Sequence, residues 1–179
     1  METWPYPIAR LKPGKEALLS KGHPWVFSGA MAEAPSAPVV RLADAAGQVL
    51  GVGTASASNP LAVRLFRREE EPLDQAFFRA RLEQALEGRR MLGLDGPEAG
   101  CRWVFGEGDL LPGLVVDRYG PALVLQVGTA GLEALRDAWW PPLQELARAA
   151  GVTVFVERSQ GGRSAEGLDP VNRLIKGSL

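Results

Sequence analysis

The sequence is poor in the residues that many enzymes and secreted proteins use for catalysis and cross-linking. Its 179 residues include one cysteine, Cys101, and one histidine, His23. A single cysteine excludes an internal disulfide and a cysteine-rich zinc site, and we interpret Cys101 as a packed thiol rather than a nucleophile. A Ser-His-Asp triad could use only His23, and the basic turn around His23 contains no carboxylate to orient it.

Long apolar runs and a strong net charge are also absent. No run approaches the roughly 20 apolar residues of a transmembrane helix, and the start, Met-Glu-Thr-Trp-Pro-Tyr-Pro, lacks the order of a signal peptide. We therefore expect a cytoplasmic protein with no membrane partner. The net charge of −1 excludes an overall basic coat for nucleic acid but allows a local basic face.

Motifs for nucleotides and methyl donors are missing as well. The nearest candidate, residues 51–56 (Gly-Val-Gly-Thr-Ala-Ser), follows an apolar run but lacks a third glycine. Residues 58–60, Ser-Asn-Pro, then stand where the helix of such a site should begin. The chain contains no phosphate loop, no Gly-x-Ser-x-Gly elbow and no His-Glu-x-x-His. We expect no catalytic, cofactor-binding or metal-binding residues in it.

What is present is a globular composition, with 46% hydrophobic and 23% charged residues, enough for one ordinary domain or two small ones. Residues 1–68 contain short apolar runs at 39–42, 49–52 and 61–66, separated by turn residues. Several short strands at close spacing predict a small, partly closed β-barrel. A possible single helical turn at residues 16–20 precedes them.

Residues 69–98 predict a linker and a connector helix. The charged run before Pro72 ends the barrel, Asp74 can cap the helix, and Phe78, Leu82 and Ala85 recur at helical spacing. The arginines between them could contact nucleic acid, although a face of mixed charge is usually a solvated one.

Residues 99–160 predict strands at 102–105, 114–118 and 122–127, a helix capped by Thr129, and a strand at 152–156. Pro141 and Pro142 predict a kink or restart of the helix, with Pro142 near a first turn. The polar tail, residues 161–179, predicts a flexible segment too short to form another buried element. The expected fold class is α+β.

Residues 106–120, Gly-Glu-Gly-Asp-Leu-Leu-Pro-Gly-Leu-Val-Val-Asp-Arg-Tyr-Gly, predict a β-hairpin. Glu107, Asp109 and Asp117 within it could form an acid/base or metal site. We interpret them as turn formers, because acidic residues beside glycines at strand ends are typically solvated. Asp117 and Arg118 are expected to tie the strand end.

A possible RNA-binding signal lies near the start of the chain. Lys12, Lys15, Lys21, His23 and Trp25 fall within one helix-turn-strand unit, which offers charges for phosphates and flat rings for bases. A solvated basic turn beside a core tryptophan would have the same sequence. The local pattern therefore leaves both interpretations open.

Two longer motifs resemble a known family. Residues 21–30, Lys-Gly-His-Pro-Trp-Val-Phe-Ser-Gly-Ala, resemble the opening of the PUA domain in class I S-adenosylmethionine-dependent methyltransferases that modify cytosine C5 in 23S ribosomal RNA. Residues 106–119 resemble the hallmark of the same family's middle domain, a β-β-α-β-β unit. Residues 77–81 match its connector helix and residues 154–159 its last strand, so the resemblance covers nearly the whole chain.

The resemblance implies four parts. These are a PUA-like RNA-binding domain at residues 1–68, a linker and connector helix at 69–98, a middle domain at 99–160, and a tail at 161–179 leading toward a catalytic domain that this sequence lacks. In the family that Rossmann-type domain binds S-adenosylmethionine and holds the catalytic cysteine. Cys101 matches no catalytic position, so no cofactor is expected in this chain.

We therefore expect the substrate-recognition part of an rRNA methyltransferase, inactive alone, with ribosomal RNA and a catalytic methyltransferase domain as partners. The alternative is a free-standing PUA-type RNA-binding adaptor, or a protein-interaction module, without a methyltransferase partner. The residues expected to contact RNA are Lys12, Lys21, His23, Trp25 and Arg64.

Overall fold

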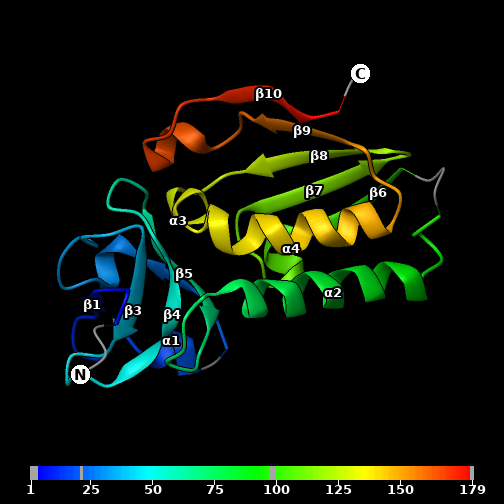
Figure 1. Cartoon of the computed structure of the whole chain (residues 1–179). Helices are drawn as coiled ribbons and strands as arrows, with labels where there is room; N and C mark the ends of the chain where they lie inside the picture. The colour runs from blue at the N-terminus through cyan, green and yellow to red at the C-terminus, as the bar shows by residue number, and fades with distance from the viewer. Residues whose placement is uncertain (1–3, 21, 97–99, 178–179) are drawn as a thin grey trace.

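The protein, described here by a computed structural model, is built from two β-sheets with helices packed between and beside them (Figure 1). The structure describes residues 4–20, 22–96 and 100–177. The N-terminal part of the chain forms one five-stranded sheet and the C-terminal part forms the other. The mixed composition of helices and strands confirms the predicted α+β class.

The elements follow one another along the chain with short connections. The first sheet contains β1 (Ile8–Arg10), β2 (Trp25–Phe27), β3 (Val39–Ala43), β4 (Val49–Ala55) and β5 (Leu61–Arg67). The second contains β6 (Gly100–Phe105), β7 (Leu114–Tyr119), β8 (Ala122–Val127), β9 (Val154–Ser159) and β10 (Val171–Lys176). The α-helices are α1 (Ala17–Ser20), α2 (Gln75–Met91), α3 (Ala130–Ala134) and α4 (Arg136–Ala149). Short 3-10 helices are η1 (Ser28–Ala30), η2 (Gly106–Asp109) and η3 (Arg163–Glu166).

The first sheet has the strand order β1-β3-β4-β5-β2 and curves into a half-barrel. Register shifts interrupt the pairing of β3 with β4, of β4 with β5 and of β2 with β5, and such bulges bend a sheet. A bridge between Leu11 and Met31 brings together the segments that follow the two edge strands. The predicted partly closed barrel is therefore confirmed.

The glycine-rich stretch that resembled a nucleotide-binding turn lies inside β4. A Cβ atom at Gly51 would lie 2.4 Å from the carbonyl oxygen of Arg67, and one at Gly53 would lie 2.2 Å from that of Arg64. The two glycines thus allow β4 to approach β5 closely at the bulge. The stretch has no strand-turn-helix geometry, so it does not fit a methyl donor.

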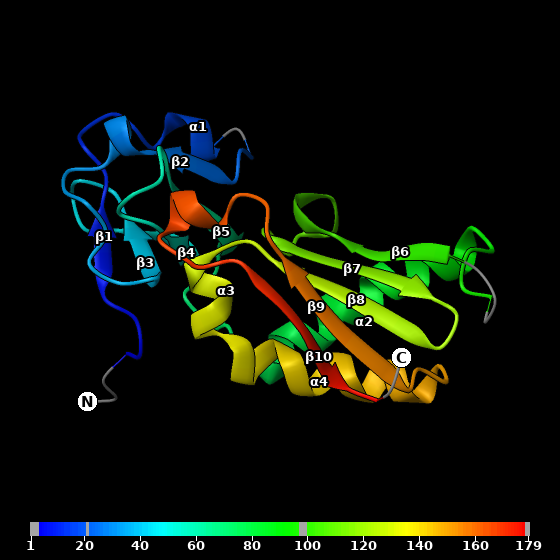
Figure 2. The same ribbon diagram turned by 90° about the horizontal axis from the view of Figure 1, so that it is seen from above.

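The second sheet has the order β10-β9-β8-β7-β6. Strands β6, β7 and β8 form successive antiparallel hairpins, and α3 and α4 connect β8 to the parallel strand β9. Helices α2 and α4 pack on one face (Figure 1), while the opposite face carries no helix from the described residues (Figure 2). The hairpin predicted at residues 106–120 is confirmed by the β7–β8 pairing.

One hydrophobic core joins the two sheets. Trp139 of α4 and Phe155 of β9 are buried in it, and Val39, Val52 and Phe66 of the first sheet belong to the same cluster. A smaller cluster fills the interior of the first sheet.

The kink or restart of the helix that was predicted at the two prolines is found instead at Leu135, between α3 and α4. Helix α3 ends before Leu135, α4 begins at Arg136, and Pro141 and Pro142 lie within α4. A proline inside a helix leaves the carbonyl four residues earlier without its usual donor. For Pro141 that carbonyl, on Asp137, accepts a hydrogen bond from the Gln75 side chain of α2 at 3.1 Å, which replaces the missing donor.

The expectation of a flexible tail without further structure is wrong. Residues 163–166 form η3, and β10 pairs antiparallel with β9. Polar contacts hold this segment in place. The buried Arg163 donates hydrogen bonds to the carbonyl of Val127 at 2.6 Å and to Glu133 at 2.8 Å. Backbone pairing and these contacts order the segment without a large apolar surface.

Candidate nucleic-acid interface

The first part of the candidate interface is the loop after β1, which runs beside η1. The backbone N–H of Lys12 donates to the carbonyl of Ala30 at 2.9 Å, and its ammonium donates to the carbonyl of Gly29 at 3.0 Å. Lys12 and Lys15 are both exposed. These bonds fix the backbone at Lys12 while its ammonium keeps donors for a phosphate.

The second part is the entry to β2. The backbone N–H of Trp25 donates to Nδ1 of His23 at 3.2 Å, and the two rings meet edge to face with centroids 5.5 Å apart. His23 is exposed and Trp25 is half-buried. The Nε1 atom of Trp25 is buried and has no hydrogen-bond partner among the described residues. The pair thus presents an exposed imidazole beside a fixed indole.

Arg64 lies directly opposite Trp25 in the β2–β5 pairing, as a shared RNA surface requires. Its side chain, however, points to Glu166 of η3, with 3.0 Å between nitrogen and oxygen, and Arg64 is only 9% exposed. Asn59 donates to the same carboxylate at 2.8 Å. Arg64 therefore links the first sheet to the C-terminal segment.

The structure thus places His23, Trp25 and Arg64 at one edge of the first sheet and Lys12 beside η1. Lys21 lies outside the described residues. The assignment of these five residues to RNA contact stays a prediction.

The hairpin carboxylates have separate arginine partners. Asp109 accepts hydrogen bonds from both terminal nitrogens of Arg89, at 2.5 and 2.6 Å, and Asp117 accepts from Arg102 at 2.8 and 3.0 Å. This pairing raises the pKa of Arg102, since the hydrogen bond to Asp117 outweighs desolvation. Among the described residues, no group of three or more potential ligands could hold a metal ion. Asp109 and Asp117 are thus each held in an ion pair with an arginine.

The strand end is tied as predicted. The Arg118 guanidinium donates to the carbonyls of Gly120 at 2.9 Å, Asp95 at 3.3 Å and Ala150 at 3.0 Å. One side chain therefore joins the β7–β8 turn to the segment that follows α2 and to the end of α4.

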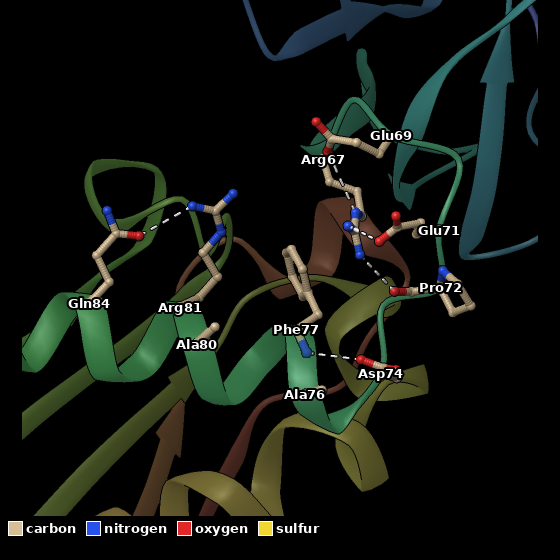
Figure 3. A pocket seen from close by; sticks show the side chains of 10 residues that line it. All are labelled: Arg67, Glu69, Glu71, Pro72, Asp74, Ala76, Phe77, Ala80, Arg81 and Gln84. Atoms are coloured by element: carbon tan, nitrogen blue, oxygen red, sulfur yellow. Dashed lines mark hydrogen bonds and ion pairs between the residues drawn. The ribbon is translucent and has the colours of Figure 1, made fainter.

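A pocket of about 520 Å³ lies where β5 leads into α2 (Figure 3). The ring of Phe77 stands between the guanidinium groups of Arg67 and Arg81, at 5.3 and 5.5 Å. Arg67 also pairs with Glu71, while Asp74 accepts the helix-capping bond. Because its lining has two arginines and three carboxylates, the pocket offers no net positive charge to an anion.

Sequence reasoning missed a buried charge network behind the second sheet. Glu157 is fully buried and accepts from Arg136 at 2.9 Å, from Arg173 at 2.8 and 3.1 Å, and from the Ser159 hydroxyl at 3.1 Å. Burial raises the pKa of Glu157, but the hydrogen bonds and charges of the two arginines outweigh it and leave the pKa below its ordinary value. The alternation along β9, which places Glu157 on the inward face, was the available signal.

Residues 9–68 match the PUA-like domain family. This range covers the whole first sheet except one residue at its start. The match confirms the predicted PUA-like domain at the N-terminal end.

Two relatives extend the similarity over the rest of the chain. Ribosomal RNA large subunit methyltransferase I of Shewanella denitrificans is 33% identical over 95% of this chain and 44% of its own length. The protein of the same description from Escherichia coli is 35% identical over 94% of this chain and 43% of its own length. The chain therefore spans less than half the length of these relatives.

Solved structures show the same fold. A candidate SAM-dependent methyltransferase from Streptococcus mutans superposes with a TM-score of 0.76 at 16% identity, over 96% of this chain and 43% of its own. A second candidate methyltransferase, in complex with SAH, superposes with a TM-score of 0.75 over 97% of this chain and 43% of its own. None of the helices in the described part of the chain is long and apolar enough to cross a membrane.

Proposed function

We propose that this chain is the RNA-recognition part of an S-adenosylmethionine-dependent methyltransferase that modifies cytosine C5 in 23S ribosomal RNA. The PUA-like match of residues 9–68 carries the proposal. It is supported by the similarity of nearly the whole chain to rRNA large subunit methyltransferases of more than twice the matched length. We assign methyl transfer to the part of such an enzyme that this chain does not match.

The proposed division of labour follows the sequence boundaries. Residues 1–68 bind RNA, residues 69–98 connect, and residues 99–160 form the middle domain. The segment from 161 onward lies against both sheets, through Glu166 on the first and β10 on the second. It therefore belongs structurally to this unit and links the first sheet to the second.

Within the RNA surface, Lys12 and Lys21 neutralise phosphates, while His23 and Trp25 contact a base. Arg64 contributes through its position behind Trp25, because Glu166 already holds its guanidinium.

The proposal is tested by the salt dependence of RNA binding. Fluorescence anisotropy with labelled 23S rRNA fragments gives the slope of log affinity against log salt for the wild type and for the double variant Lys12→Ala, Lys21→Ala. Loss of two phosphate contacts weakens binding and flattens the slope by about 1.4 for a single-stranded site. The matched control is Arg148→Ala, which removes an exposed cation from α4 on the helical layer. An unchanged slope in the double variant places the RNA site elsewhere.

The free-standing adaptor is separated from this proposal by a methyl-transfer assay. A methyltransferase domain of the Escherichia coli relative is expressed separately and supplied with labelled S-adenosylmethionine and an rRNA fragment. If this chain recognises the substrate, its addition increases methyl transfer to that fragment. RNA binding without any effect on transfer favours the adaptor.

A further inference from the structure

The second sheet has an uncovered face that the PUA-like surface does not explain. Side chains alternate between the two faces of a strand, and on β8 the residues Leu123 and Leu125 are buried against the helices. Val124 and Gln126 therefore point to the opposite face. Figure 2 looks onto that face, with α2 and α4 behind the sheet.

One row across this face combines an aromatic ring with hydrogen-bonding side chains. Strand pairing sets Phe105 opposite Val115, and Val115 opposite Gln126. Toward the other edge of the sheet, Arg158 of β9 pairs with Asn172 of β10. Phe105, Arg158 and Asn172 are all exposed.

A hollow of about 450 Å³ lies beside this row. Its lining residues come from β7, β8, β9 and the turn that follows β9: Asp117, Tyr119, Val124, Gln126, Arg158, Gln160 and Gly161. The volume falls within the range of small-ligand sites in proteins.

The chemistry of the hollow is specific. Tyr119 is 57% exposed and supplies a flat ring, while Val124 supplies an apolar patch. Gln126 and Gln160 each carry a donor and an acceptor, as the edge of a nucleobase does. The exposed guanidinium of Arg158 forms no ion pair or hydrogen bond with any described residue and is therefore available for a phosphate.

We propose that this hollow binds one unpaired nucleotide of RNA. The base stacks on Tyr119, its edge is hydrogen-bonded by Gln126 and Gln160, and Arg158 neutralises the adjacent phosphate. Single-stranded RNA is recognised in this way on open sheet faces, by stacking on aromatic rings and hydrogen bonds to splayed bases. The inference rests on the proposed function, because it adds a second contact to the same RNA.

The test uses the full chain and an eight-nucleotide single-stranded RNA of mixed sequence with a fluorescein label. Tyr119→Leu and Arg158→Ala each weaken binding by about fivefold or more, as expected for loss of one stacked base or one phosphate contact. Arg148→Ala is the matched control for charge, and it leaves the affinity unchanged. Circular dichroism of each variant confirms that the fold is retained.

Ultraviolet cross-linking followed by trypsin and mass spectrometry locates the contact independently. Cleavage yields residues 119–136, which contain Tyr119 and Gln126, and residues 22–41, which contain His23 and Trp25. A nucleotide adduct on 119–136, lost in Arg158→Ala, supports the site.

The failures of the two proposals are distinguishable. If the wild type binds no RNA of any kind, both are overturned. If RNA cross-links only to residues 22–41, and Tyr119→Leu and Arg158→Ala bind normally, the PUA-like surface stands. The nucleotide site is then wrong, and the uncovered sheet face is left to protein contact.

Discussion

Replacing Glu157 by glutamine tests whether the buried charge network holds the C-terminal segment in place. Glu157 is fully buried and lies between Arg136 of α4 and Arg173 of β10. Glutamine keeps the size of the side chain but removes its charge and one of its two acceptor oxygens. The substitution therefore leaves two arginines short of a counter-charge.

The loss in free energy of unfolding depends on whether each arginine keeps another counter-charge or reaches solvent. Removing one partner of a buried ion pair costs about 3–5 kcal/mol. Arg136 retains Glu133 at 2.7 Å, and the side chain of Arg173 is 54% exposed, so both keep some compensation. We expect the lower limit, about 3 kcal/mol, which corresponds to about 6–12 °C in melting temperature for a chain of this size.

The assay is urea unfolding followed by tryptophan fluorescence. The matched control is Glu87→Gln, the same chemical change at an exposed pair with Arg90 on α2, which we expect to alter stability by less than about 0.5 kcal/mol. A loss below about 1 kcal/mol in Glu157→Gln would show that the network does not stabilise the fold.

Two other predictions concern backbone packing and pH. Gly131→Ala places a Cβ 2.3 Å from that of Thr54, where α3 meets β4. We expect it to lower the free energy of unfolding, measured by thermal unfolding, by about 1–3 kcal/mol. Gly88→Ala, in open space on α2, should raise that free energy by about 0.5–1 kcal/mol. The folded pKa of Glu157 lies below its ordinary value of 4.5, so its stabilisation is complete above pH 4.5 and is lost as the pH falls through the folded pKa. The difference in urea midpoint between wild type and Glu157→Gln should therefore be constant above pH 4.5 and shrink below it.

Local features were predictable because local residues determine them. The cap of α2 is confirmed by the bond from the Phe77 N–H to Asp74 at 2.9 Å, and that of the following helix by the Leu132 N–H to Thr129 at 3.3 Å. A capping side chain acts within three residues of its own position, so the sequence pattern contains the whole interaction.

The features that sequence reasoning missed depend on distant partners. The ion pair of Arg64 is one of them, because its partner Glu166 lies more than 100 residues further along the chain. The order of the C-terminal segment has the same origin, because β10 needs the edge of β9, and Arg163 needs the carbonyl of Val127. Charge and strand pattern indicate that such residues need partners, but not which partners the fold brings to them.

These long-range contacts also bear on how the two proposed RNA contacts act together. Glu166 joins the first sheet to η3, Gly131 lets α3 approach β4 closely, and one hydrophobic cluster continues from sheet to sheet. Two binding sites held at a fixed separation act on one ligand with a high effective concentration, provided that the ligand spans them. Two individually weak contacts, at His23 and at Tyr119, can then select an RNA by the distance between its unpaired nucleotides, without a deep pocket at either position.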